Sequence, residues 1–192
     1  MLTELNILVV DCGSSKVPDI VNALSQNGIR VGQKKLSELN GAENEYQGIV
    51  ISGAPILLTE EDHKKYSSRI LPLLNKERPL LGICFGHQLL GLLHNTGVVR
   101  CDEDRGWQEI TIIHPGGIFE GFNNWVMLKE DHCECIGLPD GFRRTAGSSV
   151  CANEAMQHEK YPWYGVQFHP EVSGEQGQNI FNNFIKICRT WF

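Results

Sequence analysis

The sequence predicts an α/β fold in which helices cover both faces of a mostly parallel sheet. In the first half of the chain, short apolar runs alternate with segments of helical spacing, and loops that contain or adjoin glycine follow three of these runs. Parallel strands need long crossover connections, so this alternation favours a parallel sheet. Reactive groups in such sheets collect at the carboxyl ends of the strands. We therefore expect the functional groups in three loops, at residues 11–15, 52–55 and 84–85.

The elements of the first half follow from the spacing of apolar residues. Residues 6–11 (NILVVD) form a short apolar run that ends at Cys-Gly-Ser, which predicts a buried strand. Residues 17–26 carry apolar side chains at helical spacing, and Asn-Gly then ends the expected helix. The other elements expected in this half are strands at 29–31, 48–52 and 80–83 and helices at 60–75 and 86–93.

The second half has a different pattern, with short strands separated by turns that contain proline and glycine. Apolar spacing predicts a closing helix over residues 176–188. The strands are expected at 108–113, 125–128, 148–152 and 164–168. Because no repeat or linker is present, we expect residues 1–192 to form a single domain.

The composition excludes several classes of protein. The net charge of the 192 residues is -6 and no basic cluster occurs, so nucleic acid is not an expected partner. No apolar run reaches membrane-spanning length, and the first residues lack the features of a signal peptide. Seven scattered cysteines favour reduced thiols in the cytoplasm. No phosphate-binding or dinucleotide-binding glycine motif occurs, so no cofactor is expected.

Residues 82–86 (Gly-Ile-Cys-Phe-Gly) place Cys84 at a sharp turn between an apolar strand and a helix. Such a turn pushes the middle side chain out of the sheet, and the flanking glycines relieve crowding of the backbone. A helix N-terminus also favours a thiolate, which is the nucleophilic form of cysteine. A buried structural cysteine is the alternative interpretation. The two glycines and the strand–helix setting favour a nucleophile.

His169 and Glu171 are the expected partners of this nucleophile. His169 follows the apolar strand expected at 164–168, Pro170 fixes the turn, and Glu171 can bend back to the imidazole. A cysteine, a histidine base and an orienting carboxylate form the arrangement used for acyl transfer. His169 alone would be interpreted as a hydrogen-bonded loop residue, but the combination favours catalysis.

Acyl transfer also needs N–H groups that stabilise a developing oxyanion. The N–H of Phe85 begins the helix after Cys84 and is one candidate. The second candidate lies in the loop Ser-Gly-Ala-Pro at 52–55, whose alternative interpretation is a plain tight turn.

The strings GICFGHQLL (82–90) and YGVQFHPEVS (164–173) resemble the class I glutamine amidotransferases. The resemblance covers essentially the whole chain and is greatest to the glutaminase domains or subunits of GMP synthases. It implies a flavodoxin-like three-layer α/β sandwich with a mostly parallel central sheet. It also implies hydrolysis of L-glutamine to glutamate and ammonia, which a partner, an ATP-dependent synthase subunit, would consume in purine biosynthesis.

The resemblance assigns roles to individual residues. Cys84 would attack the side-chain amide of glutamine, and His169 would protonate the departing ammonia. The backbone N–H groups of Ala54 and Phe85 would hold the oxyanion. Substrate binding would fall to Gly53, Gln88, Lys129, Asp131 and His132.

Two departures from the family pattern keep other functions open. The family loop is usually Ser-Gly-Gly-Pro, but Ala54 stands at the second glycine, and in the stretch 129–135 Glu-Asp precedes the histidine in place of a Ser-His dipeptide. One alternative is a stand-alone hydrolase of γ-glutamyl amides or peptides, and another is a non-catalytic binding module of the same fold. The Cys-x-Cys at 133–135 beside His132 lacks a second ligand pair at zinc spacing, so no metal is expected.

Overall fold

A nine-stranded mixed sheet forms the centre of the molecule. The computed structural model describes residues 4–25, 28–74 and 78–191, and within them the strand order is β2-β1-β3-β4-β9-β8-β7-β5-β6. The first five strands in this order pair in parallel, which confirms the α/β class. Their bounds are β2 (Arg30–Lys35), β1 (Asn6–Asp11), β3 (Gly48–Ile51), β4 (Leu80–Ile83) and β9 (Trp163–Val166).

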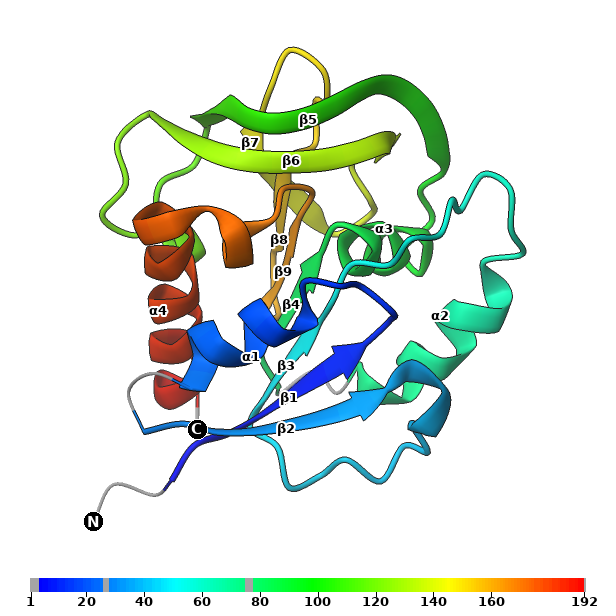
Figure 1. Ribbon diagram of the computed structural model, residues 1–192, viewed down its shortest axis with the longest axis vertical. Coiled ribbons are helices and arrows are strands. Elements are labelled where there is room, and N and C mark those ends of the chain that lie inside the picture. Colours follow the sequence, from blue (N-terminus) through cyan, green and yellow to red (C-terminus); the bar gives the residue numbers. More distant parts are fainter. Residues whose placement is uncertain (1–3, 26–27, 75–77, 192) are drawn as a thin grey trace.

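The other four strands extend the sheet in antiparallel pairs. The two longest form a hairpin that crosses above the carboxyl ends of the parallel strands (Figure 1). These strands are β5 (Val98–Ile112), β6 (Trp125–Ile136), β7 (Phe142–Gly147) and β8 (Ala155–His158). The hairpin therefore covers the edge of the sheet at which reactive groups were expected.

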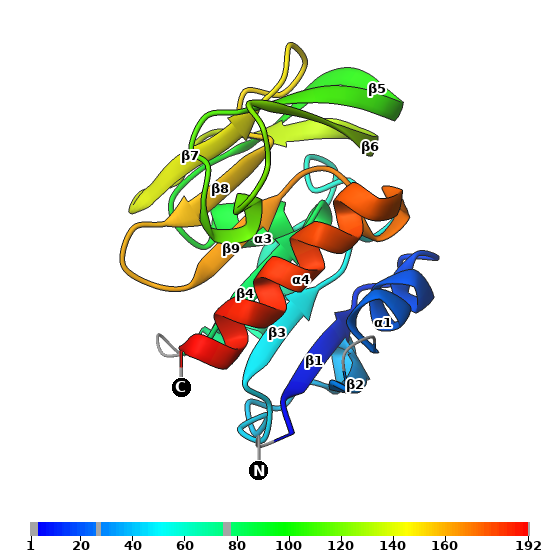
Figure 2. The ribbon, with the colours of Figure 1, turned by 90° about the vertical axis from the view of Figure 1, so that its left-hand side faces the viewer.

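Helices cover both faces of the parallel part of the sheet. Ile7 and Val9 of β1 share a core with α1 and α4, whereas Leu8 and Val10 share a second core with α2 and α3. Alternate residues of a strand point to opposite faces, so a strand covered on both faces is apolar throughout. Figure 2 shows α4 lying across the face of the sheet beside α1. The helices are α1 (Val17–Ser25), α2 (Lys64–Ile70), α3 (Phe85–Leu92) and α4 (Gly174–Thr190).

The expected helix at 60–75 is shorter in the structure. Its α-helical part is α2, and the 3-10 helix η2 (Leu71–Leu73), with Pro72 near its start, follows. Proline lacks the N–H that a continuing α-helix needs. Residue 75 lies outside the described residues, as do residues 26–27 at the expected end of the first helix.

The prediction of a strand at 148–152 is wrong, because this segment is the turn between β7 and β8. The Ser148 hydroxyl accepts hydrogen bonds from the N–H groups of Val150 and Cys151, at 3.2 and 3.0 Å. Local side-chain bonds of this kind compete with strand pairing. The strands expected at 108–113 and 125–128 are parts of the longer β5 and β6. Within the described residues, no helix is both long and apolar enough to cross a membrane.

Candidate active site

Cys84 occupies a strained turn between β4 and α3. Its φ of 49° and ψ of -104° lie outside the regions that side chains normally adopt. A Cβ atom on Gly82 would lie 2.6 Å from the backbone of Gly86, and one on Gly86 would collide with the carbonyl oxygen of Ile51. Glycine is thus required on both sides of the cysteine, as the sequence motif indicated.

His169 follows β9 and is held by several hydrogen bonds. Its Nδ1 atom lies 2.7 Å from Oε1 of Glu171, which belongs to the 3-10 helix η4 (Pro170–Val172). The backbone N–H of His169 donates to the carbonyl oxygen of Lys129 on β6, at 2.8 Å, and Ser173 Oγ donates to the His169 carbonyl oxygen, at 2.7 Å. The imidazole is buried and has little freedom to rotate.

The environment of His169 favours the protonated imidazole. Burial lowers its pKa, but hydrogen bonds to Cys84 and Glu171 outweigh the burial and raise the pKa to about 10. The sulfur, the imidazole and the carboxylate thus form a connected series. A Cβ atom on Gly53 would lie 3.2 Å from the His169 ring and 3.7 Å from Cys84 Cβ, so this glycine packs against both.

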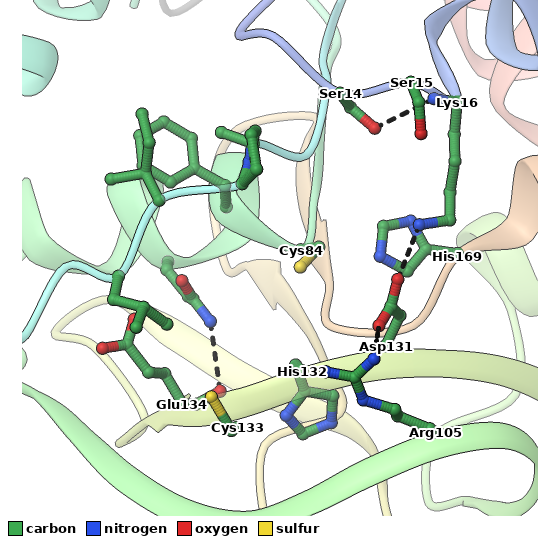
Figure 3. A pocket seen from close by; sticks show the side chains of 16 residues that line it. Ser14, Ser15, Lys16, Cys84, Arg105, Asp131, His132, Cys133, Glu134 and His169 are labelled. Atoms are coloured by element: carbon green, nitrogen blue, oxygen red, sulfur yellow. Dashed lines mark hydrogen bonds and ion pairs between the residues drawn. The ribbon is translucent and has the colours of Figure 1, made fainter.

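A cavity of about 330 Å³ opens over Cys84 and His169 (Figure 3). Five residues that the sequence selected line it together with these two: Ala54, Phe85, Gln88, Asp131 and His132. Gly53 and Lys129 do not line this cavity. Figure 3 shows the His169 ring next to Cys84 and the His132 ring below strand β6 in that view.

Lys129 lies beside the cavity, and its contacts are structural. Its Nζ atom lies 5.3 Å from the centre of the Trp107 ring, and its backbone N–H donates to Ser173 Oγ, at 2.9 Å. The backbone of Lys129 thus holds the segment that carries His169, while its side chain covers an exposed aromatic ring.

Asp131 is part of an ion-pair network at the entrance to the cavity. Lys16 Nζ lies 2.8 Å and Arg105 Nη1 lies 3.8 Å from its carboxylate oxygens. The hydrogen bond from Lys16 is the main cause that lowers the pKa of Asp131. The carboxylate is therefore neutralised by two cations that also line the cavity.

The backbone N–H groups of Ala54 and Phe85 are unpaired within the described residues. Ala54 and Phe85 both line the cavity beside Cys84. Across the described segments 4–25, 28–74 and 78–191, neither N–H donates a hydrogen bond to another protein group. Unpaired donors beside a nucleophile are what an oxyanion would need.

The comparisons with known proteins agree with this geometry. The family model described as glutamine amidotransferase class-I matches residues 8–188. The chain belongs to the class I glutamine amidotransferase family. It is 34% identical over 192 residues to a glutamine-hydrolyzing GMP synthase subunit of Methanocaldococcus jannaschii, covering 95% of this chain and 97% of that protein. The protein of the same description from Pyrococcus furiosus is 35% identical over 190 residues, with 95% and 98% covered.

Solved structures of amidotransferases have the same flavodoxin-like fold. A crystal structure of a protein assigned as a GMP synthase subunit, from Thermoplasma acidophilum, has a TM-score of 0.89 at 30% identity and covers 96% of this chain and 94% of that one. A glutamine amidotransferase from Thermotoga maritima has a TM-score of 0.76 at 21% identity, with 96% and 84% covered. The second likeness concerns the fold alone.

Gln167 contacts Cys84, although no role for it was expected from the sequence. Its Nε2 atom donates to Cys84 Sγ at 3.5 Å, and its Oε1 atom accepts from Gln88 Nε2 at 3.0 Å. Gln88 donates also to the backbone oxygen of Glu134 at 3.1 Å. Gln167 lies within the string YGVQFHPEVS, two residues before His169. This closeness in the sequence was the signal that could have identified it as a site residue.

Glu134 was also missed, and it joins β6 to the loop after β3. Its carboxylate accepts hydrogen bonds from the N–H groups of Leu58 and Thr59, at 2.8 and 2.9 Å. The carboxylate lines the cavity opposite the cations of the entrance. Only the pairing of distant segments brings this residue to the site.

Proposed function

We propose that this chain hydrolyses glutamine through Cys84, His169 and Glu171 and passes the ammonia to a partner GMP synthase subunit. The observation that carries the proposal is the imidazole of His169, which is hydrogen-bonded to Glu171 and lies next to Cys84 at a cavity of about 330 Å³. The relatives named as GMP synthase subunits support the choice of partner.

The reaction begins when the sulfur of Cys84 attacks the side-chain carbonyl carbon of glutamine. The oxyanion of the tetrahedral intermediate accepts hydrogen bonds from the N–H groups of Ala54 and Phe85. His169, whose partners favour the protonated form, donates a proton to the leaving nitrogen, and the carbon–nitrogen bond breaks to give ammonia and a thioester.

Water completes the reaction. His169, now neutral, accepts a proton from the water that attacks the thioester carbon, and the carbon–sulfur bond breaks to release glutamate. The buried carboxylate of Glu171 keeps the imidazole oriented and stabilises its charged form in both steps. The sum is glutamine plus water giving glutamate plus ammonia.

Charged groups at the cavity fit the other end of the substrate. The free amino acid carries an ammonium and a carboxylate, and the cavity is lined by both signs of charge. In this proposal Arg105 binds the carboxylate. Glu134 binds the ammonium through Oε2, which accepts a single hydrogen bond in the part of the chain that the structure describes, whereas Oε1 accepts two.

Glutamate release with and without the partner tests the proposal. We expect the synthase subunit to raise the rate of glutamine hydrolysis, and Cys84→Ala to abolish hydrolysis under both conditions. A glutamine analogue that alkylates thiols should label Cys84 in the wild type and leave the Cys84→Ala protein unlabelled.

The two alternatives predict different results. A hydrolase of γ-glutamyl conjugates would cleave those conjugates faster than glutamine and would not respond to a synthase. A non-catalytic module would release no glutamate and would not react with the analogue, whether or not the partner is present. Either result would contradict the proposed function.

A further inference from the structure

A buried cluster of sulfur, imidazole and carboxylate groups lies where β5, β6 and the turn after β7 meet. The ligand atoms of Cys101, His132 and Cys135 all lie within 4.8 Å of one another. Cys101 lies on β5, and His132 and Cys135 lie on β6. Two thiols and one imidazole from two neighbouring strands therefore surround a single point.

The spacing of these atoms matches a tetrahedral zinc site. Cys101 Sγ lies 3.7 Å from His132 Nδ1. Zinc binds cysteine sulfur at about 2.3 Å and histidine nitrogen at about 2.0 Å, which places neighbouring tetrahedral ligands roughly 3.5 Å apart. Cys101 and Cys135 are both free thiols. Little movement of the chain would bring the three ligands to bonding distance.

The other side of the His132 ring faces the buried carboxylate of Glu130. Nε2 of His132 lies 3.3 Å from Oε2 of Glu130, and the two side chains are 2% and 0% exposed. In the part of the chain that the structure describes, neither oxygen of Glu130 completes a hydrogen bond, and neither does His132 Nε2. Histidines that bind metal through one nitrogen usually donate the other N–H to a carboxylate. A metal on Nδ1 would fix this tautomer and turn Nε2–H toward Glu130.

We propose that Cys101, His132 and Cys135 bind one zinc ion, with Glu130 as the hydrogen-bond partner of the histidine. Two cysteines and one histidine are a known zinc ligand set, in which water takes the fourth position. Each thiol that binds gives its proton to solvent, so zinc uptake releases protons. Asp104, His132 and Glu154 form a second group of possible ligands, but thiolates select zinc over the hard cations that carboxylates prefer.

The ion would stabilise the strand that lines the amidotransferase cavity. β6 carries Asp131, Cys133 and Glu134, which line the cavity. Zinc would fasten this strand to β5 through Cys101. Because only the folded chain brings the ligands together, zinc should stabilise the folded state against heat. The inference does not depend on the proposed function.

Zinc content and cobalt spectroscopy test the site. The full chain, purified under reducing conditions without chelator and incubated with zinc chloride, should hold one zinc per chain. Its Tm should rise with zinc and fall on chelation. Cobalt(II) in place of zinc should give a thiolate-to-cobalt charge-transfer band. Cys101→Ser and Cys135→Ser should each lose this band, and Glu130→Gln should weaken zinc binding roughly tenfold or more.

Cys133→Ser is the matched control, because its sulfur accepts a hydrogen bond from Arg100 at 3.3 Å instead of facing the cluster. This variant should keep the cobalt band and the zinc. A reduced, folded wild-type protein that takes up neither metal would overturn the proposal, even if every variant failed to fold. Equal loss of the band in Cys133→Ser and Cys135→Ser would also overturn it. Cys84→Ala should bind zinc as the wild type does. Zinc binding can therefore be tested independently of whether the chain hydrolyses glutamine.

Discussion

The Nδ1 atom of His169 lies 2.7 Å from Oε1 of Glu171, two residues further along the chain. The pair is buried, with side chains 4% and 0% exposed. A short turn thus places the carboxylate of Glu171 directly against the imidazole of His169.

Replacing the carboxylate of Glu171 should lower kcat and leave substrate binding unchanged. We expect Glu171→Gln to reduce kcat for glutamine hydrolysis roughly 10²- to 10⁴-fold, because the neutral amide orients the imidazole poorly and does not stabilise its charge. Steady-state kinetics measure the change. Glu175→Gln, on the exposed first turn of α4, should keep wild-type kcat. Near-normal turnover by Glu171→Gln would argue against its orienting role.

Gln167 should affect the rate without forming part of the triad. Gln167→Leu removes the hydrogen bond to Cys84 Sγ and one acceptor of Gln88. One hydrogen bond contributes about 1 kcal/mol, so kcat should fall roughly five- to tenfold. The control is Gln178→Leu, since Gln178 bonds to Ala23 and Asn182 away from the cavity. An unchanged rate in Gln167→Leu would mean that this amide does not position the sulfur.

Arg105 should act on substrate binding. If its guanidinium binds the glutamine carboxylate, Arg105→Gln should raise KM about tenfold with little change in kcat. Arg143→Gln provides the comparison, because Arg143 bonds to Gln157 on another part of the sheet. A fall in kcat at constant KM would contradict a role in ground-state binding.

The glycines beside Cys84 should be required for stability. A Cβ atom on Gly86 would collide with the backbone of Ile51, whereas one on Gly97 would meet nothing within 4 Å. We expect Gly86→Ala to lower the free energy of unfolding by about 1–3 kcal/mol, and Gly97→Ala to change it by less than about 1 kcal/mol. Urea denaturation compares the two. Equal stability of both variants would show that the turn can relax.

His87 should make the protein sensitive to acid. Burial lowers its pKa to about 3, so between about pH 3 and 6.5 the unfolded chain binds a proton there that the folded chain does not. The contribution of this group to the free energy of unfolding is therefore complete above about pH 6.5. It falls as the pH drops, by roughly 3 kcal/mol at pH 4.5.

Denaturation curves at several pH values would measure this slope. His87→Gln should have a shallower loss of stability between pH 6.5 and 4.5, whatever its absolute stability at pH 7. His114→Gln, at an exposed position, should keep the wild-type slope. Parallel pH profiles for wild type and His87→Gln would assign the acid sensitivity to other groups.

The sequence predicted the parallel half of the fold well and the antiparallel half poorly. Fully apolar strands such as 80–83 are easily recognised in the sequence, because both of their faces are buried and every residue is apolar. The segment 148–152 also contains apolar residues, but Ser148 bonds to its own neighbours and makes a turn. In β5 and β6, polar residues alternate with apolar ones far beyond the stretches that were expected.

The sequence by itself determined the local chemistry of this protein: the glycine-flanked cysteine, the histidine with its carboxylate two residues later, and the family. These features depend on neighbours along the chain. Only the tertiary structure decided which distant groups meet, since strand register and the irregularity between Arg100 and Asp104 set where each side chain of the β5–β6 hairpin points. That register places Asp131 at the cavity and Lys129 outside it, and it brings Cys101 to His132 and Cys135, which are far from it in the sequence.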